Sequence, residues 1–94
     1  MNQYKHKIHI GNLIYNALKE EGRSASWLAK KIHCERSNIY KIFEKASIDA
    51  SLLLKISLAL KTNFFVYYFD IYQNTMDKNQ ENHQSVANLD TKRS

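Results

Sequence analysis

Residues 26–43, SWLAKKIHCERSNIYKIF, contain two short helical patterns separated by a few residues. In the first pattern, Leu28, Ala29 and Ile32 share one face of a helix expected over about residues 25–32. The second pattern has its apolar residues on one face of a helix expected over about residues 36–44: Ile39, Ile42 and Phe43. Ser24 is a suitable N-cap for the first helix, and Ala29 is small enough to let the two helices cross closely. The stretch therefore predicts a pair of packed helices joined by a tight turn.

The second helix has a polar face that its apolar residues leave free. Arg and Asn side chains carry paired hydrogen-bonding groups that match the edges of guanine and adenine, and Ser, Tyr and Lys side chains bind phosphates. All five residue types lie in the first turns of this helix: Arg36, Ser37, Asn38, Tyr40 and Lys41. This composition favours double-stranded DNA as the partner.

The rest of the chain extends the helical pattern to five helices. Apolar residues recur at helical spacing from Ile10 until Gly22 ends the first helix, and again after a cap expected at Asp49 or Ser51. A short fifth helix is expected over about residues 65–69. Proline is absent and no useful stretch alternates with period two, so the predicted class is all-α. Residues 1–9 are expected to form a loose arm, and residues 74–94 a disordered polar tail.

Residues 24–45, SASWLAKKIHCERSNIYKIFEK, resemble the helix-turn-helix of the phage-repressor and Cro-like (XRE) family. The Leu28-Ala29 pair, Ile32 and the run RSNIYKI at residues 36–42 carry the resemblance. It implies a five-helix, lambda-repressor-like domain over residues 1–73 that binds DNA sequence-specifically as a transcription regulator, and as a homodimer. The expected DNA-binding set joins the polar face to flanking backbone contacts: Ser24, Ser26, Lys30, Lys31, Arg36, Ser37, Asn38, Tyr40, Lys41 and Lys45.

Two positions depart from the family pattern. Ala25 stands where the family often has a Gln that contacts the DNA backbone, so Ser24 or Ser26 is expected to supply any such contact. His33 stands where the turn usually has Gly. Because His is among the residues that tolerate a left-handed conformation, we expect the turn to form around it.

Length, charge and cysteine content agree with this interpretation. Ninety-four residues make one small domain, and a formal charge of +5 with a pI near 9.4 favours an anionic partner. Residues 23–45 alone carry six basic and two acidic side chains. The single cysteine, Cys34, the lack of a signal-peptide pattern and the shortness of the apolar run FFVYYF indicate a cytoplasmic protein without membrane spans.

Catalytic and metal-binding motifs are missing from the sequence. With two glycines there is no phosphate-cradling loop, and no Ser or Cys has a His and an acid at suitable spacing. His6 and His9 supply at most half a metal site and are interpreted as part of a solvated arm. We therefore expect no enzyme activity, no metal and no cofactor.

The aromatic run FFVYYFDIY at residues 64–72 exceeds what one small core needs. An exposed aromatic patch marks an interaction site, so a candidate dimer interface comprises Phe64, Phe65, Tyr68, Phe69 and Tyr72. The alternative is that the cluster folds back on the core at Leu13, Ala17 and Leu60. The aromatic cluster also leaves open a different function, in which the chain is a protein-interaction module or the antitoxin of a toxin-antitoxin pair.

Overall fold

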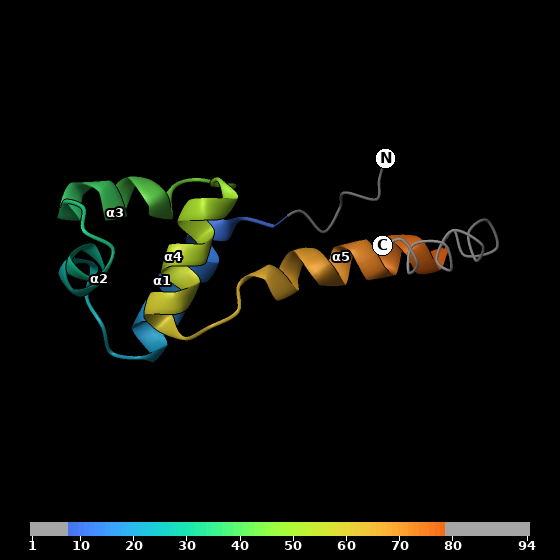
Figure 1. Cartoon of the computed structure of the whole chain (residues 1–94), viewed down its shortest axis with the longest axis horizontal. Helices are drawn as coiled ribbons and strands as arrows, with labels where there is room; N and C mark the ends of the chain where they lie inside the picture. Colours follow the sequence, from blue (N-terminus) through green and yellow to red (C-terminus); the bar gives the residue numbers. More distant parts are fainter. Residues whose placement is uncertain (1–7, 79–94) are drawn as a thin grey trace. The chain divides into compact units, whose positions relative to one another are not determined.

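The computed structural model describes residues 8–78, and within them it contains five helices and no strand. In chain order the helices are α1 (Ile10–Glu20), α2 (Ala25–Lys31), α3 (Arg36–Phe43), α4 (Ala50–Leu60) and α5 (Phe65–Lys78) (Figure 1). The all-α prediction is confirmed. The chain divides into two units, of which Lys7–Phe65, here called the four-helix unit, contains α1 to α4. The other unit contains α5 from Val66 onward.

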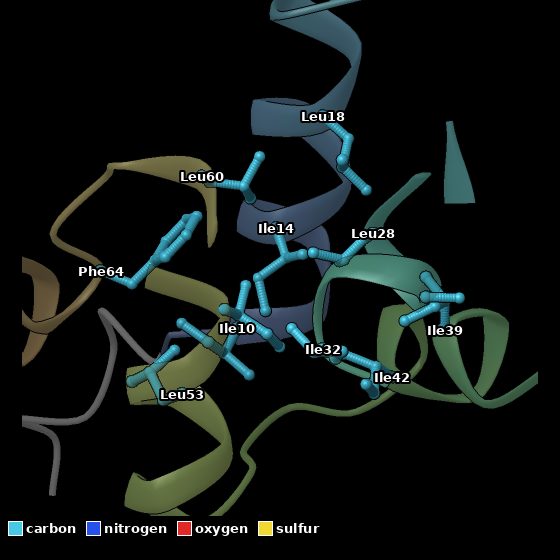
Figure 2. Close-up of a cluster of buried hydrophobic side chains, with 12 residues drawn as sticks. Ile10, Ile14, Leu18, Leu28, Ile32, Ile39, Ile42, Leu53, Leu60 and Phe64 are labelled. Atoms are coloured by element: carbon cyan, nitrogen blue, oxygen red, sulfur yellow. The ribbon is translucent and has the colours of Figure 1, made fainter. Parts of the chain in front are cut away.

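The four-helix unit has a single apolar core built from all of its helices. Figure 2 shows side chains of α1, α2, α3 and α4 converging, together with residues from two connections. Their exposed fractions are 7% or less: Ile10, Ile14, Leu18, Leu28, Ala29, Ile32, Ile39, Ile42, Leu53, Ile56, Leu60 and Phe64. Burial of such side chains stabilises the fold by about 1.5 to 3 kcal/mol each, before conformational entropy is subtracted.

Local capping sets where α1, α2 and α4 begin. The Ser24 hydroxyl accepts from the Trp27 amide at 3.0 Å, and the Asp49 carboxylate accepts from the Leu52 amide at 2.7 Å. These bonds confirm Ser24 as a cap and select Asp49 over Ser51. His9 Nδ1 accepts from the Asn12 amide at 3.2 Å and Ile8 packs against the core, so the predicted loose arm does not extend through residues 8 and 9. Residues 1–7, His6 among them, lie outside the described residues.

The first turn of α1 docks directly onto the backbone that follows α3. The Ile10 and Gly11 amides donate to the carbonyls of Ala46 and Lys45, both at 2.9 Å. Gly11 is buried, and a Cβ added there would overlap the carbonyl groups of Ile42 and Phe43. The glycine is therefore required for close approach between α1 and the end of α3, which fixes α3 against the core.

Three helices end in the same hydrogen-bonded motif around a left-handed residue. Gly22, His33 and Lys61 have φ angles of 69°, 59° and 53°. After α2, the Cys34 amide donates to the Ala29 carbonyl at 2.9 Å and the His33 amide donates to the Lys30 carbonyl at 3.4 Å. This is the Schellman pattern, and it confirms the left-handed turn expected at His33.

Replacing His33 by glycine should raise the free energy of unfolding by about 0.5 to 1 kcal/mol. The left-handed conformation is unfavourable for a residue with a Cβ, and glycine removes this steric cost. Part of the stabilisation is lost because glycine also raises the conformational entropy of the unfolded chain. Urea denaturation followed by circular dichroism measures the change. His33→Ala is the matched control, since it keeps the Cβ and should not stabilise. A glycine variant no more stable than the alanine variant would contradict the assignment of strain to His33.

The C-terminal part of the chain corrects two predictions. Helix α5 continues to Lys78, so the disordered tail predicted from Asn74 is wrong over residues 74–78, and residues 79–94 lie outside the described part. Phe64 is 1% exposed and belongs to the core, so it is not available for the predicted dimer interface. Phe65 is partly buried against the same core. Both aromatic rings lie in the four-helix unit, whose last residue is Phe65.

Between residues 8 and 78, no single helix is both long and apolar enough to cross a membrane. Helices α4 and α5 reach that length and hydropathy when they are taken together across the bend between them.

Candidate nucleic-acid interface

The helix pair α2–α3 presents one side of α3 to the core and the other side outward. Figure 1 shows α2 nearly end-on and α3 lying across the view, so the two axes run in different directions. Leu28 of α2 and Ile39 of α3 are fully buried, and Ala29 is 4% exposed. The turn between the helices, residues 32–35, is held by the Cys34 amide bonding back to Ala29. The small side chain of Ala29 and this hydrogen bond together set the direction of α3 relative to α2.

Every residue of the predicted DNA-binding set has an exposed side chain. Ile39 and Ile42 take the buried side of α3. The polar residues of the helix are exposed on its outer side: Arg36, Ser37, Asn38, Tyr40 and Lys41. The structure therefore places the predicted base-reading residues on one surface, here called the α3 face. It carries two cations, one amide and two hydroxyls.

The N-terminus of α3 has no side-chain cap. Glu35 occupies the N-cap position with extended backbone, and its side chain makes no capping hydrogen bond. Helix N-termini carry a partial positive charge and amides directed outward, and these favour phosphate groups. Sequence reasoning did not anticipate this feature, although the absence of Ser, Thr or Asp at position 35 is visible in the sequence.

Aromatic side chains connect the α3 face to α1. The Tyr40 ring is edge-to-face with Phe43 at 5.8 Å between centroids, and Phe43 is edge-to-face with Tyr15 at 5.2 Å. The Arg36 guanidinium lies 5.9 Å from the Tyr40 ring and the Lys19 ammonium lies 5.4 Å from the Tyr15 ring. These contacts hold Tyr40 and Arg36 in defined positions. Tyr15 and Lys19 are absent from the predicted set because only the tertiary fold brings α1 beside the end of α3.

The flanking basic residues separate into two groups. Lys30 and Lys45 are exposed beside the helix pair, and Lys45 belongs to the backbone onto which α1 docks. Lys31 instead lies 5.5 Å from the Trp27 ring and lines a cavity that includes Lys61 at the end of α4. The structure therefore does not group Lys31 with the α3 face. Trp27 lines this same cavity.

Comparisons with models of protein families, with curated proteins and with solved structures found no match. Functional inference for this chain therefore depends on its own residues and geometry.

Proposed function

We propose that the four-helix unit is a sequence-specific binding module for double-stranded DNA of the phage-repressor and Cro-like type, acting in transcription regulation. The observation that supports the proposal is the two-sided character of α3. Its Ile39 and Ile42 are buried against α2 and the core, while its outer side carries the side-chain chemistry that reads base pairs. The concentration of Arg, Asn, Ser and Tyr in the first turns of α3 favours a DNA-binding surface over an ordinary solvated one.

In this proposal α3 is a recognition helix that lies in the major groove. Arg36 pairs with guanine and Asn38 pairs with adenine, each through two hydrogen bonds. Ser37, Tyr40 and Lys41 bind phosphates, and the uncapped first turn of α3 adds backbone amides. Backbone contacts at the edges of the site come from Ser26, Lys30 and Lys45. The Ser24 hydroxyl accepts from the Trp27 amide and so starts α2, and its O–H is still able to donate to a phosphate.

Selection of binding sites from a random duplex library tests sequence specificity. The proposal predicts enrichment of one short sequence that contains guanine and adenine in adjacent major-groove positions. A dimer would enrich two copies as an inverted repeat, with centres about one helical turn, roughly 34 to 36 Å, apart. Recovery of unenriched sequence after several rounds would refute the proposed function.

Helix α5 is the proposed dimer interface. Within the described part of the chain it has no buried residue, and Phe69 and Tyr72 are each 57% exposed. Their ring centroids lie 6.5 Å apart, and Tyr68 precedes Phe69 directly. Exposed aromatic patches mark protein-binding surfaces, so the same helix also supports the alternative of a heterologous protein partner, as an antitoxin would have.

The double substitution Phe69→Ser and Tyr72→Ser should convert a dimer to a monomer, measured as a halved mass in light scattering. Leu54→Ser and Leu58→Ser form the matched control, because these two α4 side chains are also exposed and apolar, at 50% and 68%. If α5 forms the interface, the control retains the dimer mass. A monomeric wild-type protein would refute the homodimer. Dissociation by the leucine substitutions alone would move the interface to α4.

A further inference from the structure

A cavity of about 280 Å³ lies within the four-helix unit, where the α1–α2 turn, α2 and the end of α4 meet. It is distinct from the α3 face, since none of its lining residues belongs to α3. Seven residues line it: Glu21, Arg23, Trp27, Lys31, Ala59, Leu60 and Lys61. This volume lies just below the usual range of small-molecule sites, which begins at about 300 Å³, so only a small ligand would fit.

Positive charge dominates the cavity. The lining has three cations, Arg23, Lys31 and Lys61, and one carboxylate, that of Glu21. Within residues 8–78, none of these four side chains forms an ion pair. The Arg23 guanidinium lies 4.4 Å from the centroid of the Trp27 ring, and the Lys31 ammonium lies 5.5 Å from it. The indole attracts both cations through its π face but supplies no counter-charge. Three cations around one concave surface therefore favour an anion.

The end of α4 fixes the backbone position of one of these cations, Lys61. Lys61 has a φ of 53°, a conformation that favours glycine, yet the residue there carries a long cationic side chain. Its amide donates to the Leu58 carbonyl at 3.3 Å, and the Thr62 amide donates to the Ser57 carbonyl at 3.0 Å. This is the same helix ending that His33 makes after α2, and here it places Lys61 in the lining of the cavity.

The apolar part of the lining indicates what accompanies the negative charge. The Trp27 ring, Ala59 and Leu60 give the cavity an apolar wall, while the three cations supply its charged side. We propose that this cavity binds a small organic anion, a carboxylate or a phosphate ester, with an apolar body that contacts Trp27. The guanidinium of Arg23 matches either anion through two parallel hydrogen bonds. This site does not depend on the proposed DNA-binding function and is tested without DNA.

Trp27 is the only tryptophan of the chain, so its fluorescence reports directly on the cavity. The full-length protein is titrated with benzoate, phenyl phosphate, inorganic phosphate and benzamide. Benzoate and phenyl phosphate distinguish the two kinds of anion, inorganic phosphate lacks the apolar body, and benzamide is the neutral counterpart of benzoate. The proposal predicts saturable changes with one or both organic anions at concentrations up to about 10 mM, and at least tenfold weaker responses to the other two probes.

Substitutions locate the binding. Arg23→Gln and Lys61→Gly should each weaken the effective anion about tenfold, as expected when a charge-assisted hydrogen bond is lost. Lys61→Gly should also stabilise the fold by relieving the left-handed residue, so any loss of binding cannot be attributed to unfolding. Lys55→Gln, an exposed α4 lysine outside the cavity, is the control and should bind normally. Absence of a saturable response to both organic anions, an equal response to benzamide, or an equal loss in Lys55→Gln would overturn the proposal.

Discussion

Replacing Gly11 by alanine will destabilise the four-helix unit by about 3 kcal/mol, although helix propensity alone favours alanine by about 1 kcal/mol. The added Cβ would overlap the Ile42 and Phe43 carbonyl groups, which are backbone atoms and cannot rotate away. Relief requires α1 to separate from the end of α3, and this breaks the bonds from Ile10 and Gly11 to Ala46 and Lys45. Each lost bond contributes about 1 kcal/mol. Small domains have about 5 to 15 kcal/mol in total, so the variant will be close to unfolding at moderate temperature.

Gly22→Ala is the matched control for this prediction. The chemical change is identical, but nothing lies within 4 Å of a Cβ at Gly22, and the penalty is confined to the left-handed φ of 69°. That conformation costs a residue with a Cβ about 1 kcal/mol once unfolded-chain entropy is included. Urea denaturation followed through Trp27 fluorescence compares both variants with wild type. A Gly11→Ala protein as stable as wild type, or more stable than Gly22→Ala, would show that α1 does not pack on the end of α3 in this way.

Arg36→Ala should weaken binding to a selected DNA sequence by about 1 to 3 kcal/mol while changing binding to random duplex much less. Arg36 is exposed at the start of α3, where the proposed docking brings a guanidinium to base edges, and its guanidinium lies 5.9 Å from the Tyr40 ring. Lys45→Ala should instead weaken both kinds of DNA alike, because a phosphate contact carries no sequence information. Fluorescence anisotropy with labelled selected and random duplexes measures the four affinities.

Equal losses on selected and random DNA for both variants would remove the distinction between base reading and backbone binding. Lys55→Gln serves as the charge control here too, since Lys55 is exposed on α4 and outside the α3 face. If Lys55→Gln loses as much affinity as Arg36→Ala, the protein binds DNA through its overall positive charge and not through the α3 face. Circular dichroism of the variants checks that the helices are retained.

Features that depend on neighbouring residues were predictable from the sequence. The starts of α2 and α4 follow from Ser24 and Asp49, whose side chains bond to amides three residues later. The turn at His33 follows from the few residue types that tolerate a positive φ. The outward position of Asn38 follows from helical spacing, since Ile39 and Ile42 occupy the buried side of the helix. Local geometry therefore accounts for the helix pair and for the exposed α3 face.

Features that depend on distant contacts were not predictable in the same way. Phe64 and Phe69 belong to one aromatic run, yet Phe64 fills the core and Phe69 is exposed, which only the path of the chain after α4 decides. Leu54 and Leu58 lie in an apolar helix and are nevertheless exposed, because α4 has more apolar residues than one buried face accommodates. The cavity at Trp27 joins residues from α2 and the end of α4, so no local pattern could indicate it.

We propose that the four-helix unit binds double-stranded DNA through the α3 face. Fluorescence anisotropy of the full chain on a mixed-sequence duplex, at about 50 and 200 mM salt, tests it most directly. Three exposed cations are assigned to phosphates: Lys30, Lys41 and Lys45. Release of about three counterions predicts an affinity that falls about fortyfold between the two salt concentrations. Absence of binding at the lower salt concentration, or binding that does not change with salt, would contradict the account.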